Sequence, residues 1–62
     1  MNGYYELVVK QLKAHGYTLL RQAGGSHQIW SDGSRNVTVS TNLYSRHTAN
    51  AILRQAGIRH HF

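Results

Sequence analysis

The sequence predicts an α+β fold in which a helix, a three-stranded antiparallel sheet and a second helix follow one another in a single domain, residues 1–62. Three observations predict it. Apolar residues recur at helical spacing near both ends of the chain, β-branched residues alternate with polar ones in the middle, and an Asp-Gly pair separates two strand candidates. The chain has 62 residues, of which 40% are hydrophobic, so it is not a charge-rich disordered chain. It contains no cysteine, which excludes disulfides and thiolate zinc sites.

The first helix is expected over about residues 4–14. One helical face carries apolar residues at positions i, i+3, i+4 and i+7, namely Tyr5, Val8, Val9 and Leu12. Gly16 follows and can adopt the left-handed conformation that ends a helix. His15, in the last turn, interacts favourably with the helix dipole when it is charged.

Three short strands are expected, at 17–22, 26–30 and 36–40. Gly24-Gly25 interrupts the chain between the first two strands. Asp32-Gly33 lies between the second and third strands and is a strong signal for a tight hairpin. Consecutive strands between two helices indicate an antiparallel sheet with both helices on one face, which leaves the other face open to solvent or a ligand.

The second helix is expected to begin at a cap formed by Ser45 or Thr48 and to end at Gly57. Its apolar stripe consists of Ala49, Ile52, Leu53 and Ala56. Ile58 is expected to make the hydrophobic contact that accompanies such a helix end. The expected core of the whole fold is Val8, Val9, Leu12, Leu20, Val37, Val39, Ile52 and Leu53.

The hairpin register decides which face of the sheet carries His27. A two-residue Asp32-Gly33 loop pairs Trp30 with Arg35 and Gln28 with Val37. Because Val37 and Val39 are the natural core residues, Trp30 then lies on the core side and His27 lies on the open face. A three-residue loop would shift the register by one and turn His27 inward.

The charge balance favours a polyanionic partner or an acidic protein partner. Lys and Arg number 7 against 2 for Asp and Glu, which gives a net charge of +5. The two carboxylates, Glu6 near a helix start and Asp32 in a turn, have structural explanations, so paired-carboxylate catalysis is not expected. The 5 His residues show no known ligand spacing, and no nucleotide-binding fingerprint is present, so neither a metal nor a cofactor is expected.

The segment Gly24-Gly25-Ser26-His27 is the strongest candidate for chemistry. Glycines let the backbone approach a ligand closely, their exposed N–H groups can bind anionic oxygens, and an imidazole is suited to proton transfer near neutral pH. His27 is the expected catalytic residue. The expected substrate-binding residues are Arg21, Gly25, Ser26, Gln28 and Arg35. The alternative interpretation is a glycine-rich turn followed by an ordinary exposed histidine.

Three segments together resemble one protein family. They are His15-Gly16-Tyr17, the run from Leu20 to His27 that reads Leu-Arg-Gln-Ala-Gly-Gly-Ser-His, and the run from Ile52 to Ile58 that reads Ile-Leu-Arg-Gln-Ala-Gly-Ile. With the hairpin between them, they make the chain similar to the HicA toxins of bacterial toxin–antitoxin systems over nearly its whole length.

The resemblance implies a double-stranded-RNA-binding-domain-like fold and an mRNA interferase with one catalytic histidine, here His27. It also implies a HicB-type antitoxin that binds the toxin and covers its active site. The chain departs from the family after the third strand: many members have a Pro and a His there, and this chain has Ser40-Thr41-Asn42.

The leading functional hypothesis is therefore a metal-independent endoribonuclease toxin that cleaves mRNA and is neutralised by a HicB-type antitoxin. The alternative is a non-catalytic RNA-binding module of the same fold, and a third possibility is a protein-interaction subunit. No secretory signal or membrane-spanning run is evident, so a cytoplasmic protein without a membrane partner is expected.

Overall fold

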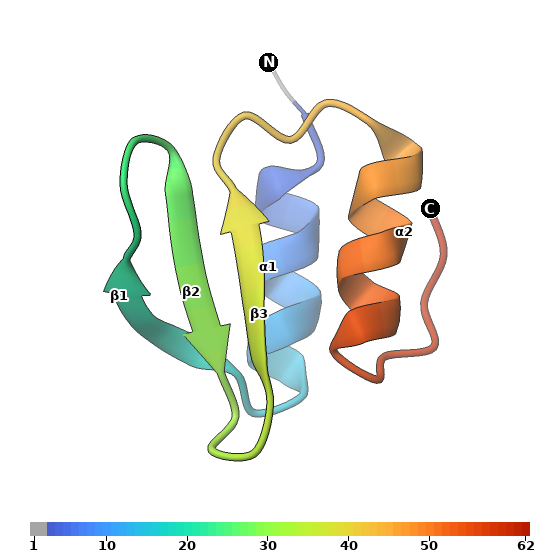
Figure 1. Cartoon of the computed structure of the whole chain (residues 1–62). Coiled ribbons are helices and arrows are strands. Elements are labelled where there is room, and N and C mark those ends of the chain that lie inside the picture. The colour runs from blue at the N-terminus through green and yellow to red at the C-terminus, as the bar shows by residue number, and fades with distance from the viewer. Residues whose placement is uncertain (1–2) are drawn as a thin grey trace.

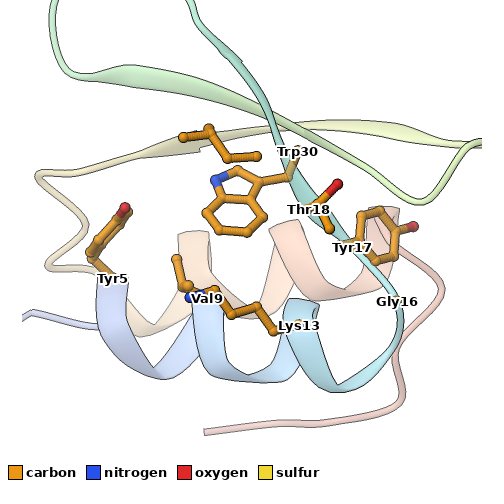
Figure 2. A pocket seen from close by; sticks show the side chains of 8 residues that line it. Tyr5, Val9, Lys13, Gly16, Tyr17, Thr18 and Trp30 are labelled. Atoms are coloured by element: carbon orange, nitrogen blue, oxygen red, sulfur yellow. The ribbon is translucent and has the colours of Figure 1, made fainter.

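The computed structural model describes residues 3–62, so residues 1 and 2 of the expected domain lie outside it. Along the described chain the elements are α1 (Tyr5–Ala14), β1 (Thr18–Gln22), β2 (His27–Ser31), β3 (Asn36–Ser40) and α2 (Arg46–Gln55). The strands form one antiparallel sheet in the order β1-β2-β3. Both helices pack on the same face of this sheet (Figures 1 and 2). The predicted α+β architecture is confirmed. Neither helix among these residues is long and apolar enough to cross a membrane.

Both helices end in the same way, and for the reason that the sequence indicates. Gly16 and Gly57 have positive φ angles of 87° and 77°. The residue after each glycine, Tyr17 or Ile58, donates its N–H to the carbonyl five residues earlier at 2.9 Å, and both side chains are buried. At the start of α2, the hydroxyl of Ser45 accepts the N–H of Thr48 at 3.3 Å, so Ser45 is the cap.

The core lies between the sheet and the two helices. Its buried apolar residues are Val8, Leu12, Tyr17, Trp30, Val37, Val39, Leu43, Ala49, Ile52, Leu53, Ala56 and Ile58. Two residues that were expected in the core are not fully buried: Leu20 is 57% exposed, and Val9 is only partly buried against the core. The expectation for Leu20 was wrong because β1 is an edge strand with an irregularity between Leu19 and Arg21, which leaves Leu20 without a cross-strand partner.

The hairpin between β2 and β3 has a four-residue loop instead of the expected two-residue one. Trp30 pairs with Val37, not with Arg35, and Gln28 pairs with Val39. The side chain of Asp32 explains the longer loop, because its Oδ1 accepts two backbone N–H groups within the turn at 2.7 and 2.8 Å. The register therefore moves by two residues. A register shift of two residues leaves each side chain on the same face of the sheet, so Trp30 lies on the core side as predicted.

Candidate functional site

His27 lies on the face of the sheet that no helix covers. It is the first residue of β2, its side chain is exposed, and it pairs with Ser40 of β3. Arg21 of β1 pairs with Ile29, which is two residues from His27 and on the same face. Arg21 and His27 are therefore diagonal neighbours, about 7–8 Å apart at the backbone, a distance that an arginine side chain can bridge. The expected position of His27 on the open face is confirmed.

The turn before His27 depends on its two glycines. Gly24 and Gly25 have φ angles of 60° and 55°, in the region where side chains are strained. A Cβ at either position would meet nothing within 4 Å, so conformation and not space requires glycine here. Two backbone hydrogen bonds across the turn fix the position of His27. Its N–H donates to the carbonyl of Gly24 at 3.1 Å, and its carbonyl accepts the N–H of Ala23 at 2.9 Å.

The segment that follows β3 also borders this turn. Thr41 donates its N–H to the carbonyl of Ser26 at 2.7 Å, which fastens the glycine turn to the end of β3. The hydroxyl of Ser40, opposite His27, accepts the N–H of Asn42 at 3.1 Å and keeps its own proton to donate. Ser40 was not among the expected site residues. Its position depends on the β2–β3 register, which local sequence patterns do not determine.

Arg21, Gly25 and Ser26 thus lie around His27, but Arg35 does not. Arg35 belongs to the hairpin turn at the other end of β2, and the five residues of this strand alone separate the two ends by about 13 Å. Its guanidinium reaches the carbonyl of Gln55 at 3.4 Å, where a positive charge stabilises the last turn of α2. The structure assigns Arg35 a contact with the helix end and does not bring it to His27.

Gln28 lies on the opposite face from His27 and is 9% exposed. Its Oε1 accepts two hydrogen bonds, from the Tyr5 hydroxyl at 2.8 Å and from the Trp30 Nε1 at 3.0 Å. The side chain therefore links α1 to the inner face of the sheet. It does not reach the open face, and we do not retain it among the substrate-contacting side chains.

Within residues 3–62, no three His, Asp or Glu side chains come together as metal ligands. Hydrogen bonds from the backbone N–H groups of Arg35 and Ser34 lower the pKa of the Asp32 carboxyl, which keeps it ionised as the cap of its own turn. That carboxylate lies in the hairpin, far from His27.

These features define a small basic α+β protein with an exposed histidine and a fixed glycine turn on an open sheet face. A family model described as the HicA toxin of bacterial toxin–antitoxin systems matches residues 5–58. The chain belongs to this HicA toxin family, as the motifs in its sequence predict, and membership implies an antitoxin partner. No curated protein and no solved structure matched the chain.

Proposed function

We propose that this toxin is an endoribonuclease that cleaves mRNA with His27 as its one catalytic histidine, and that a HicB-type antitoxin neutralises it by covering His27. The observation that carries the proposal is the exposed position of His27 between Arg21 and the glycine turn, in a chain of the HicA family. The net charge of +5 favours a polyanionic substrate.

The proposed reaction uses the substrate's own nucleophile. The 2′-hydroxyl of RNA attacks the adjacent phosphorus, the bond from phosphorus to the 5′-oxygen breaks, and the products are a 2′,3′-cyclic phosphate and a 5′-hydroxyl. His27 either accepts the proton of the 2′-hydroxyl or donates one to the leaving 5′-oxygen, and water completes the other transfer. No metal is needed for this route, and DNA is spared because it lacks the 2′-hydroxyl.

Other groups around His27 supply the binding and the charge. Arg21 is within reach of a phosphate held beside His27 and neutralises charge that develops on its oxygens. Gly25 and Ser26 lie in the turn next to His27, where backbone N–H groups and a short hydroxyl can donate to anionic oxygens. The hydroxyl of Ser40, opposite His27, is a further donor.

The test is cleavage of an RNA oligonucleotide by the purified chain and by His27→Ala, with and without a chelator. Loss of a positioned acid–base group lowers the rate by about 10²–10⁴-fold, and the fold is retained because the side chain is exposed. His47→Ala, which removes another exposed histidine on α2, is the matched control and keeps the wild-type rate. A His27→Ala protein with a native circular dichroism spectrum and an unchanged rate would refute the assignment.

The products and the pH profile test the mechanism separately. A rate that rises towards neutral pH indicates that His27 acts as the base, and a rate that falls indicates that it acts as the acid. A 5′-phosphate on the product would contradict attack by the 2′-hydroxyl. RNA that is shifted in a gel but remains intact would indicate the binding-module alternative.

Arg21 and Arg35 provide a further matched comparison. Arg21→Gln lowers kcat/KM for RNA, because Arg21 is next to His27. Arg35→Gln leaves kcat/KM unchanged and lowers only the free energy of unfolding, because Arg35 contacts the end of α2. Equal effects of the two changes on RNA cleavage would contradict the assignment of Arg21 to substrate binding and of Arg35 to stability alone.

A further inference from the structure

A second surface lies on the helix-covered side of the sheet, between α1 and β1. All residues of β1 are exposed, so α1 does not cover this edge strand. The space between them is an open groove of about 610 Å³, and the residues that matter for its character are Tyr5, Val9, Lys13, Leu19 and Trp30. Figure 2 shows the Trp30 ring at the sheet side of this groove, facing Val9 and Lys13 on α1.

The groove presents an apolar surface beside a positive charge. Leu19 is 47% exposed and pairs with Trp30, which is only 4% exposed. The Nζ of Lys13 lies 6.0 Å from the centroid of the Trp30 ring, a distance at which a cation and an aromatic face attract. A smaller hollow of about 330 Å³ adjoins the groove along α1 and adds Lys10 and Glu6 to its lining.

We propose that this groove is a docking site for the antitoxin, which inserts an apolar side chain beside the exposed Leu19 and pairs carboxylates with Lys10 and Lys13. The proposal rests on the antitoxin partner that family membership implies and not on catalysis at His27. The charges argue for it: the chain has 7 basic and 2 acidic residues, and the groove and its adjoining hollow carry two lysines against one glutamate.

Two other occupants fit the groove less well. RNA binds through phosphates and stacked bases, whereas the groove is largely apolar and its one tryptophan is 4% exposed. A symmetric dimer would place the lysines of both copies in one interface, where each copy offers only Glu6 from the adjoining hollow to pair with them. An acidic, apolar segment of a protein partner satisfies both the lysines and the exposed leucine.

The groove and His27 lie on opposite faces of the sheet, so the two sites are separable by mutation. Contacts in the groove supply affinity and leave the catalytic face to be covered by another part of the antitoxin. Changes in the groove therefore weaken inhibition without changing the rate of cleavage by the free toxin.

The test compares Leu19→Glu with Leu7→Glu, because both leucines are 47% exposed and only Leu19 lines the groove. The probe is the purified product of the gene adjacent to the toxin gene, and its Kd for each toxin variant is measured by calorimetry. Leu19→Glu is expected to weaken binding at least 100-fold and Leu7→Glu less than threefold, with RNA cleavage by both equal to wild type. Binding of Leu19→Glu within threefold of wild type would overturn the proposal. Loss of RNA cleavage with antitoxin binding retained would also overturn it, because the groove would then serve the substrate.

The single tryptophan gives a readout that does not depend on catalysis or on Leu19. Toxin labelled with 5-fluorotryptophan reports the surroundings of Trp30 by its ¹⁹F resonance. This resonance is expected to shift when the antitoxin binds, in wild type and in His27→Ala alike, so failure of the proposed catalysis leaves this result intact. An unmoved resonance in a formed complex would show that the antitoxin binds elsewhere.

Discussion

Replacing Gln28 by Met separates a structural role from a role in substrate binding. The Gln28 Oε1 accepts hydrogen bonds from the Tyr5 hydroxyl at 2.8 Å and from the Trp30 Nε1 at 3.0 Å. Methionine is similar in size to glutamine but cannot replace this acceptor. Gln28→Met therefore removes both hydrogen bonds and leaves the buried indole N–H of Trp30 without a partner.

The expected cost is large for so small a protein. Each lost hydrogen bond costs about 1 kcal/mol, and the unpaired indole N–H raises the total to about 2–3 kcal/mol. Proteins have about 0.05–0.15 kcal/mol of stability per residue, which is about 3–9 kcal/mol for 62 residues. Gln28→Met is thus expected to remove about a fifth or more of the free energy of unfolding. It leaves KM for RNA unchanged at temperatures where the variant is folded.

A double-mutant cycle with Tyr5→Phe tests the reasoning by urea unfolding. Tyr5→Phe alone is expected to cost about 1 kcal/mol, and almost nothing when Gln28 is already Met, because the shared hydrogen bond is then absent. The coupling between the two positions is therefore about 1 kcal/mol. Additive costs would refute the shared hydrogen bond. A Gln28→Met protein of unchanged stability and raised KM would return Gln28 to the substrate-binding residues.

Three further predictions concern stability. Leu53→Ala in the core is expected to cost about 2–5 kcal/mol and to abolish toxicity by unfolding; an unchanged Tm would contradict the burial of Leu53. Tyr17→Phe is expected to cost about 1 kcal/mol, because the buried hydroxyl donates to a carbonyl at the end of α2 at 2.8 Å, whereas Tyr44→Phe at a 70% exposed position should cost nothing. Burial raises the pKa of the Tyr17 hydroxyl above its ordinary value of 10.0. The contribution of this hydroxyl to the free energy of unfolding is therefore complete below pH 10.0 and is lost as pH rises through the raised pKa. The difference in stability between wild type and Tyr17→Phe should close over that pH range. Hydrogen bonds from backbone N–H groups lower the pKa of Asp32 below 3.8, so the stability gap between wild type and Asp32→Ala is present above pH 3.8 and should shrink as pH falls through the lowered pKa. Urea unfolding across pH measures both gaps, and a constant gap in either case would contradict the contact.

The helices were predictable because the information that determines them is local. The spacing of apolar residues and the positions of Gly16 and Gly57 lie within a few residues of the structures that they specify. The burial of β1 was not predictable in the same way. Leu19 and Leu20 are both apolar, but the irregularity at Leu20 and the reach of α1 decide their exposure. Leu43 is 2% exposed in an irregular connection, where no periodicity marks it as a core residue.

The candidate site shows the same division between local and long-range information. The face on which His27 lies depends only on whether the β2–β3 register is shifted by an odd or an even number of residues. The turn around Asp32 lengthens the loop by two residues. The predicted face of His27 is therefore correct, although the predicted cross-strand pairs are wrong. The position of Arg35 depends instead on the full length of that loop and on where α2 ends, because its guanidinium contacts Gln55, twenty residues further along the chain. Sequence patterns therefore identified the residue that faces the open surface, while the neighbours of that residue required the three-dimensional structure.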